Sequence, residues 1–422
     1  MRVKWIAVLT LLIVLASLTA GGCKKEAAGL ETVIMWTHGA ENPDFLAATE
    51  AAIADFQEAN PNITVQLENF TYDVFIQKLR ASFAAGDEAD VLQIFGTWAT
   101  DYARKGYLDP VPDTIDTSGF FPASLGGYTW EGKLYGLPHE YNLECGGMLV
   151  HPAMFQEADL EYPQTWADLV AAAKVLTKRD TQGLTRAGFI FTSLDNIVYS
   201  FLSFILQQGA DYWNGDQTAV NFSTPEAQTA WKALLDLIVV AKVEDPSLVS
   251  GEEDTSDYFY KGQAAMCYRG PWTIAAGLNS YNLSDFDYVP VPPFAGDSMV
   301  FAAESGWGEI VSARSQHKAA AWKLVEFLTT DSALAWNLRS FTLPARQDVA
   351  ADPAYIEQAG PLMATPLTVL EGGRWIGPLW DRDRFFDILN RHFLAAAAGL
   401  ETYEASLKAV ETELNAMLAE NQ

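Results

Sequence analysis

The sequence predicts an α/β fold in which two lobes enclose a cleft. Segments with the patterns of strands and helices alternate in the first part of the chain, and a second alternating series begins after Trp130. No long segment rich in proline, glycine or serine separates the two series. At 422 residues the chain also exceeds one comfortable hydrophobic core. When two lobes have no linker between them, the chain usually crosses from one lobe to the other several times. Small ligands bind in the clefts between such lobes.

The first series begins with the apolar run Val33-Ile34-Met35-Trp36, which predicts a buried strand. The elements that follow are expected at residues 44–59 (helix), 63–70 (strand), 74–85 (helix) and 91–95 (strand). Such a rhythm is typical of a sheet that is covered by helices on both faces.

The second series predicts strands and helices in the same alternation. Glu131-Gly132-Lys133 is expected to turn the chain between two short strands. Strands are then expected at 147–150, 286–291 and 307–311, and helices at 166–177, 194–208, 225–240 and 318–329. Thr165 is expected to cap its helix, with Asp168 completing a capping box, and Ala264-Ala265-Met266 is expected to form a small buried strand. Pro344 interrupts the chain, and the remainder is predicted to be mainly helical.

The predicted lobes are each assembled from two segments. We expect lobe 1 to contain residues 31–140 and 290–343, and lobe 2 to contain residues 141–289 and 344–422. Three crossovers, near Tyr141, Pro290 and Pro344, would then form a hinge.

The N-terminus has the layout of an export signal. Arg2 and Lys4 precede an apolar run, and small residues follow as far as Cys23. We expect residues 1–22 to be removed, Cys23 to be lipidated and residues 23–30 to form a tether. The alternative is an ordinary secretory peptide with an incidental cysteine, because Ala20 stands where a lipoprotein signal usually has leucine. The apolar run is short for a membrane span.

Composition excludes several classes of function. The formal net charge of −27 would repel phosphate backbones, so no nucleic-acid partner is expected. The five histidines lack the spacing of metal ligands, and neither a phosphate-binding loop nor a Gly-x-Ser-x-Gly motif occurs. We therefore expect no cofactor, no metal and no catalytic residues. Cys145 and Cys267 are interpreted as buried strand residues, with a disulfide between them as the alternative.

Several motifs occur together along the chain. They are Gly132-Lys133-Leu134-Tyr135-Gly136-Leu137-Pro138 before Tyr141-Asn142, Pro163-Gln164-Thr165-Trp166-Ala167-Asp168-Leu169, Phe259 to Met266 followed by Gly270-Pro271-Trp272, and Gly306-Trp307-Gly308 with Leu343-Pro344-Ala345-Arg346. In these motifs the sequence resembles family 1 extracellular solute-binding proteins, the maltose-binding-protein-like receptors of sugar importers. The resemblance implies a class II periplasmic-binding-protein-like fold that closes around a ligand at its hinge.

The resemblance also implies a function and its partners. The chain would be the extracytoplasmic, lipid-anchored subunit of an ABC-type importer that binds a neutral sugar, expected to be a di- or oligosaccharide. Permease subunits and a separate ATPase would be its partners, and the protein is expected to be a monomer.

Sugar chemistry suggests which residues form the site. Pyranose C–H faces stack on aromatic rings, and hydroxyl groups pair with carboxylates, amides and guanidinium groups. The predicted aromatic contacts, at strand ends, are Trp36, Trp98, Trp272, Trp307 and Trp375. The predicted polar contacts are His38, Glu41, Glu140, Asn142, Glu304, Arg346 and Arg374. Trp231, Trp322 and Trp336 fall inside predicted helices and are interpreted as packing residues.

Two alternatives remain open from the sequence. A secreted glycosidase would use a carboxylate pair, such as Glu140 with Glu144 or Asp381 with Asp383. A receptor for a phosphorylated polyol such as glycerol 3-phosphate would hold the phosphate with Arg346 and Arg374. The many tryptophans and the negative charge favour the neutral sugar.

Overall fold

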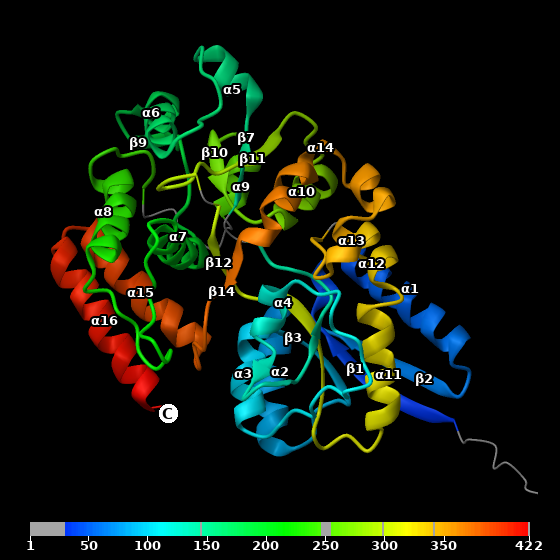
Figure 1. The fold of residues 1–422 in the computed structure, drawn as a ribbon. Coiled ribbons are helices and arrows are strands. Elements are labelled where there is room, and N and C mark those ends of the chain that lie inside the picture. Colours follow the sequence, from blue (N-terminus) through cyan, green and yellow to red (C-terminus); the bar gives the residue numbers. More distant parts are fainter. Residues whose placement is uncertain (1–29, 144–145, 246–254, 298, 341, 421–422) are drawn as a thin grey trace, which may run out of the picture.

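The computed structural model describes residues 30–143, 146–245, 255–297, 299–340 and 342–420. They form two α/β lobes that lie side by side (Figure 1). The predicted leader and tether up to residue 29, including Cys23, lie outside the described residues, as do Glu144 and Cys145. Within the described chain, no helix has the length and apolar character needed to cross a membrane.

The first lobe is built on a five-stranded sheet of order β2-β1-β3-β13-β6. The strands are β1 (Glu31–Thr37), β2 (Ile63–Asn69), β3 (Val91–Phe95), β6 (Leu137–Pro138) and β13 (Trp307–Val311). β1 runs parallel to β2 and β3, whereas β13 runs antiparallel to β3 and β6. The carboxyl ends of β1 and β3 therefore meet the amino end of β13, and this shared edge faces the second lobe.

Helices cover both faces of this sheet. They are α1 (Pro43–Ala59), α2 (Tyr72–Ala85), α3 (Gly96–Arg104), α11 (Lys318–Thr329) and α12 (Ala333–Ser340). Val33 and Met35 pack in the same core as α1, whereas Trp36 packs in a separate core with α2. Successive strand residues point to opposite faces, so one strand serves both cores. α4 (Pro122–Gly126) and the hairpin β4 (Thr129–Trp130)–β5 (Lys133–Leu134) complete this part of the chain.

The second lobe has a three-stranded antiparallel sheet, with β7 (Gly147–Val150) between β10 (Met266–Tyr268) and β11 (Asp287–Pro290). Around it lie α5 (Pro152–Glu157), α6 (Trp166–Leu176), α7 (Leu194–Gln207), α8 (Pro225–Val239), α9 (Thr255–Tyr260), α10 (Trp272–Ala275), α15 (Arg382–Ala397) and α16 (Tyr403–Glu420). A second hairpin pairs β8 (Lys178–Asp180) with β9 (Gly183–Arg186). α13 (Gln347–Ala350) and α14 (Pro353–Val369) lie near the junction of the lobes (Figure 1).

One predicted crossover lies elsewhere in the structure. β12 (Phe301–Ala303) pairs in parallel with β14 (Gly373–Trp375) and packs on α7, which are elements expected in lobe 2. The chain enters the first sheet only at Trp307, so this crossing occupies residues 304–306 rather than Pro290. Gly306 adopts a left-handed φ of 85°, and a Cβ there would lie 2.3 Å from the Glu140 carbonyl oxygen. The close approach of the backbone at Gly306 to the backbone at Glu140 thus requires glycine. The remaining lobe boundaries stay predictions.

Local sequence signals are reproduced in several elements. Thr165 caps α6, and it exchanges hydrogen bonds with Asp168 in the expected capping box. Trp231, Trp322 and Trp336 are buried packing residues, as expected from their helical positions. The predicted strand at Ala264 is shifted, because β10 begins at Met266 and Ala264 makes only an isolated bridge to Ala187.

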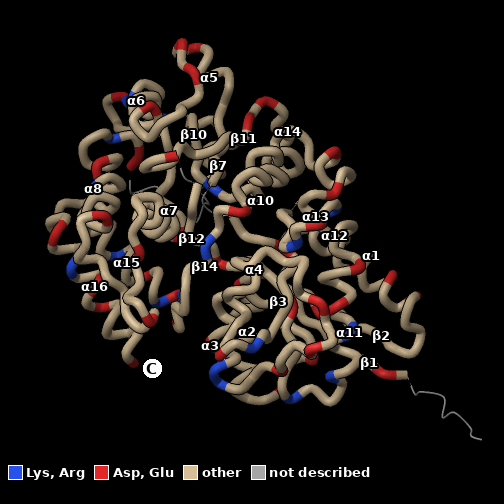
Figure 2. The backbone as a smooth tube through the Cα atoms, viewed as in Figure 1, with Lys and Arg blue, Asp and Glu red and all other residues tan. Residues whose placement is uncertain are grey.

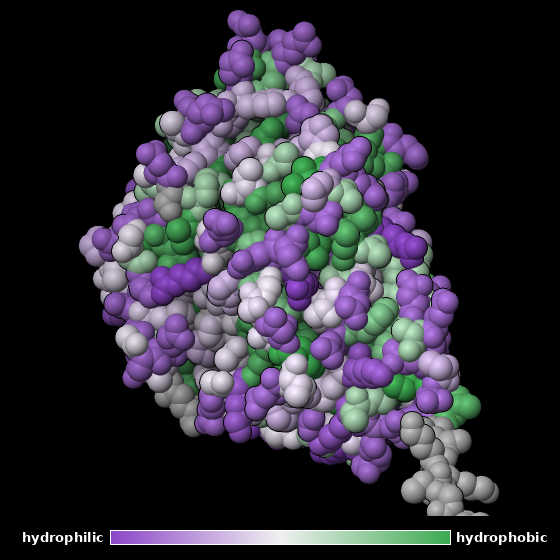
Figure 3. All heavy atoms as spheres, turned by 45° about the vertical axis from the view of Figure 1, so that its right-hand side comes forward, coloured by the Kyte–Doolittle hydropathy of each residue, from purple (hydrophilic) through white to green (hydrophobic). Residues whose placement is uncertain are grey.

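Acidic residues are distributed along the backbone of both lobes (Figure 2). One face of the molecule, drawn in Figure 3, is largely hydrophilic with small apolar areas between.

Candidate functional site

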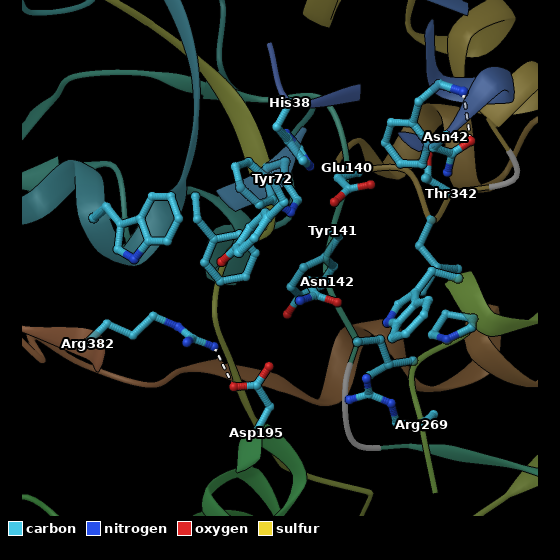
Figure 4. A pocket seen from close by; sticks show the side chains of 18 residues that line it. His38, Asn42, Tyr72, Glu140, Tyr141, Asn142, Asp195, Arg269, Thr342 and Arg382 are labelled. Carbon is cyan, nitrogen blue, oxygen red and sulfur yellow. Dashed lines mark hydrogen bonds and ion pairs between the residues drawn. The ribbon is translucent and has the colours of Figure 1, made fainter. Parts of the chain in front are cut away.

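A cavity of about 600 Å³ opens between the lobes at the hinge. Its walls come from three places: the strand ends of the first sheet with the adjoining starts of α1 and α2, the hinge segments around residues 140–143 and 342–343, and the starts of α7, α10 and α15 (Figure 4). The lining residues are His38, Asn42, Phe45, Tyr72, Phe95, Trp98, Glu140, Tyr141, Asn142, Leu143, Asp195, Arg269, Pro271, Trp272, Trp307, Thr342, Leu343 and Arg382.

Six of the predicted site residues line this cavity. They are His38, Trp98, Glu140, Asn142, Trp272 and Trp307. Although they are far apart in the sequence, each lies at the end of a strand, at the hinge or at a helix start. The structure thus places these six residues around one cavity, and ligand contact by them stays a proposal.

Trp36 is corrected to a core residue. It is 6% exposed, its ring meets Phe70 edge to face at 6.0 Å, and the Lys78 ammonium lies 3.9 Å from its ring centroid. The alternation of β1 turns Trp36 toward α2, whereas the chain reaches the cavity two residues later, at His38. The backbone of Glu41 ends the 3₁₀ turn η1 (Gly39–Glu41), and its side chain is outside the described structure.

The two arginines expected to hold ligand are also outside the lining. Arg346 pairs with Asp348, and its guanidinium covers Phe120. Arg374 pairs with Asp211 on the second lobe. The adjacent Trp375 packs against α4, where a Cβ on Gly126 would lie 2.4 Å from its ring. Arg374 and Trp375 contact Asp211 and α4 because β14 pairs with β12 and is not part of the sheet edge at the cavity.

Glu304 lies one layer behind the cavity, where it holds Arg382. Its two carboxylate oxygens accept hydrogen bonds from Arg382 at 2.7 and 2.8 Å, and Oε1 also accepts one from Thr97. Arg382 in addition donates to Asp195 at 3.0 Å (Figure 4). Burial opposes the charge of Arg382, but Glu304 and Asp195 raise its pKa well above the ordinary value. Arg382 is therefore a fixed cation at the cavity wall, oriented by Glu304 at the crossing and by Asp195 at the start of α7.

An aromatic wall stands on the first lobe. Trp307 begins β13 and meets Trp98 edge to face at 5.6 Å and Phe95 at 5.2 Å. The imidazole of His38 stacks on Trp307 at 3.8 Å. Burial lowers the pKa of His38 to about 4, so that its ring is neutral at physiological pH.

The second lobe supplies a facing ring. Trp272 is 37% exposed at the start of α10, and the Arg269 guanidinium lies 4.8 Å from its ring centroid. Arg269 itself is buried and donates to Ser193. A Cβ at Gly270 would lie 2.7 Å from the indole nitrogen of Trp272, so glycine allows the ring to fold back over its own turn.

Sequence reasoning missed Tyr72, Asp195, Arg269 and Arg382 among the polar lining residues. Tyr72 and Asp195 each begin or nearly begin a helix, α2 and α7. Arg382 follows Asp381, which caps α15 by accepting from the backbone of Arg384. The sequence signal for such residues is a polar side chain in the first turn of a helix that follows a strand. This signal does not tell which helices start at the cleft.

The described residues contain no group of histidine, cysteine, aspartate and glutamate side chains suited to a metal ion. Of the proposed glycosidase pairs, Asp383 forms an ion pair with Arg80 and Asp381 serves as a helix cap. The cavity therefore combines flat apolar rings with neutral and charged hydrogen-bonding groups, which suits the binding of a polar molecule with apolar faces.

The model of the family described as bacterial extracellular solute-binding protein matches residues 39–335. A putative binding protein of Brucella abortus (strain 2308) is 25% identical over 86% of this chain and 88% of its own length. An arabinooligosaccharide-binding protein of Halalkalibacterium halodurans is 23% identical over 78% of this chain and 74% of its own.

Among solved structures, an ABC transporter solute-binding protein from Thermotoga lettingae, bound with alpha-D-tagatose, superimposes with a TM-score of 0.75. It is 24% identical and covers 92% of this chain and 100% of its own. At this identity the likeness shows the fold, a two-lobed binding protein whose lobes enclose a cleft.

Proposed function

Since this chain belongs to the bacterial extracellular solute-binding protein family, we propose that it captures a neutral di- or oligosaccharide for an ABC-type importer. The family sets the coarse function, solute binding outside the cytoplasm. The sugar, its size and the contacting residues are proposals that rest on the chemistry of the cavity.

One observation carries the sugar assignment: aromatic rings from both lobes, Trp98 and Trp307 from the first and Trp272 from the second, line the same cavity. Pyranose rings offer apolar faces to such surfaces, and Glu140 and Asn142 at the hinge present oxygen and nitrogen atoms for hydroxyl groups. A cavity of about 600 Å³ falls in the range of small-molecule sites, roughly 300–1,000 Å³. The cavity volume is large enough for more than one sugar unit.

The charges of the cavity favour a neutral ligand over a phosphorylated polyol. The two arginines expected to hold a phosphate, Arg346 and Arg374, pair with Asp348 and Asp211 outside the lining. The cationic charge of Arg382 is balanced by Glu304 and Asp195. A phosphate at this wall would approach those carboxylates as well as the guanidinium.

We propose hinge closure as the mechanism of capture. Ligand would bind one lobe and the second lobe would close over it, so that contacts with both rings stabilise the closed form. Permease subunits would recognise the closed form, and a separate ATPase would drive transport. Lipidation at Cys23 would hold the monomer at the outer face of the membrane.

A thermal-shift screen of the mature protein tests the function. The panel contains neutral mono-, di- and oligosaccharides, with glycerol 3-phosphate as the competing class. A neutral di- or oligosaccharide should raise the melting temperature in a concentration-dependent way, and isothermal calorimetry should give a one-site curve. A response confined to glycerol 3-phosphate would contradict the sugar assignment. Chromatography of the incubated oligosaccharide should return it unaltered, whereas cleavage would indicate a glycosidase.

A further inference from the structure

A chain of buried polar side chains runs from the core of the first lobe to the cavity wall. Glu309 on β13 contacts His139 after β6, His139 contacts Gln93 on β3, and Gln93 contacts His38 after β1. Gln93, His139 and Glu309 are each at most 4% exposed. The only member that lines the cavity is His38. In a chain of this kind, the choice of donor and acceptor at one hydrogen bond fixes the donor and acceptor at the next.

The Gln93 amide sets the direction of the chain. Its Oε1 atom lies 3.4 Å from the backbone nitrogen of His38, and a backbone N–H only donates. Oε1 therefore faces His38 and Nε2 faces His139. Because Oε1 only accepts, the His38 Nδ1 atom at 2.8 Å must carry the hydrogen of that ring.

The other half of the chain agrees with this direction. The Gln93 Nε2 atom only donates, so the His139 Nε2 atom at 3.1 Å accepts. The hydrogen of neutral His139 then lies on Nδ1 and is donated to Glu309 Oε1 at 2.7 Å. Burial lowers the pKa of His139, but Glu309 and Glu140 together raise it above the ordinary value. A second proton, on Nε2, would face the amide hydrogens of Gln93, so it requires the amide to turn over.

His38 is neutral, with a pKa lowered to about 4 by burial, and a neutral imidazole has one hydrogen. With that hydrogen on Nδ1, the Nε2 atom is an acceptor, and no hydrogen-bond partner for it occurs among the described residues. The ring stacks on Trp307 and points toward the cavity in Figure 4. The face of the imidazole is thus covered while Nε2 is left to a ligand.

We propose that Glu309, acting through neutral His139 and Gln93, fixes His38 as the Nδ1–H tautomer, so that the ligand site presents an acceptor at Nε2. Glu309, His139 and Gln93 are positioning residues, because the hydrogen bond at one ring nitrogen decides which tautomer the other shows. The consequence for the ligand, which rests on the proposed function, is selection of a hydroxyl group that donates to His38. The tautomer itself requires no ligand, so its test stands even if no sugar binds.

The experiment uses the ligand-free mature protein labelled with ¹⁵N-histidine. Two-bond ¹H–¹⁵N correlation spectra at alkaline pH, where the imidazoles are neutral, distinguish protonated from unprotonated ring nitrogens. Single His→Gln variants assign the signals. His38 and His139 should both show a protonated Nδ1 and an unprotonated Nε2. A wild-type spectrum with the hydrogen of His38 on Nε2 would overturn the proposal.

Two variants test the transmission along the chain. Gln93→Met keeps an unbranched side chain but removes the amide, and His38 should then shift to the Nε2–H form that imidazole prefers in water. Glu309→Gln keeps an acceptor for His139 and should preserve the wild-type pattern at His38. Retention of the Nδ1–H form in Gln93→Met would refute the role of the chain. If either variant fails to fold, the wild-type spectrum alone still decides the tautomer.

Discussion

The imidazole of His38 lies 3.8 Å from the indole of Trp307, with an angle of 25° between the ring planes. The first sheet brings the two residues together, because the carboxyl end of β1, at Thr37, and the amino end of β13, at Trp307, lie at the same edge of the sheet. β3 lies between these strands and contributes Gln93, which anchors the imidazole on its other edge. Stacking on Trp307 and the hydrogen bond to Gln93 together hold the His38 ring at the cavity wall.

Trp272 should be the most informative aromatic substitution. Trp272→Ala should weaken binding of the sugar identified in the screen by roughly tenfold or more, because one stacking face is lost. Its ring is 37% exposed, so the melting temperature of the ligand-free protein should stay close to wild type. Calorimetry measures the affinity. Trp272→Phe should recover part of it, and Trp375→Phe, outside the cavity lining, should not change it. Unchanged affinity in Trp272→Ala would refute the contact.

Glu304→Ala should destabilise the protein. It removes the carboxylate that holds the buried guanidinium of Arg382, and breaking such a pair costs roughly 3 kcal/mol or more. Urea unfolding at neutral pH measures the loss. The matched control is Lys232→Ala in the exposed pair with Asp236, which should cost only about 0.5 kcal/mol. Equal effects from the two substitutions would contradict the structural role of the Arg382 pair.

His38 should make stability depend on pH. In the unfolded chain its pKa lies near the ordinary 6.5, whereas in the folded protein burial lowers it to about 4. Between these values the unfolded state binds more protons, so stability is fully present above 6.5 and falls as the pH falls toward 4. The loss should be on the order of 3 kcal/mol. Urea titrations of wild type and His38→Gln measure it, and parallel pH profiles of the two proteins would exclude this contribution.

Ligand should draw the lobes together. Two polar contacts already join them near the cavity: Arg80 on α2 pairs with Asp383 on α15, and Asn279 donates to Asp44 on α1. If closure favours such contacts, the cognate sugar should reduce the radius of gyration slightly in small-angle scattering and raise the melting temperature. Arg80→Ala should weaken affinity by shifting the lobes toward the open form. A tightly bound sugar with an unaltered scattering curve would count against hinge closure, while binding itself would stand.

The sequence by itself determined the local elements and their class. Hydrophobic periodicity located α1, α2, α11 and β13 within a few residues, because an element that buries one face must repeat its apolar positions at a fixed period. Thr165 and Asp168 likewise predicted a helix start, since a capping box involves only neighbouring residues. Six of the predicted residues line the cavity because they lie at strand ends, at the hinge or at a helix start.

Only the tertiary structure decided which of these positions meet. Trp36 and His38 are two residues apart, yet one is in the core and the other at the cavity wall. Arg374 lies outside the cavity lining because β14 pairs with β12, whereas Arg382, eight residues later in the chain, is held at the wall by Glu304. Strand partners and long-range ion pairs join segments that no local pattern relates, so periodicity predicts an element and its buried face but not its neighbours.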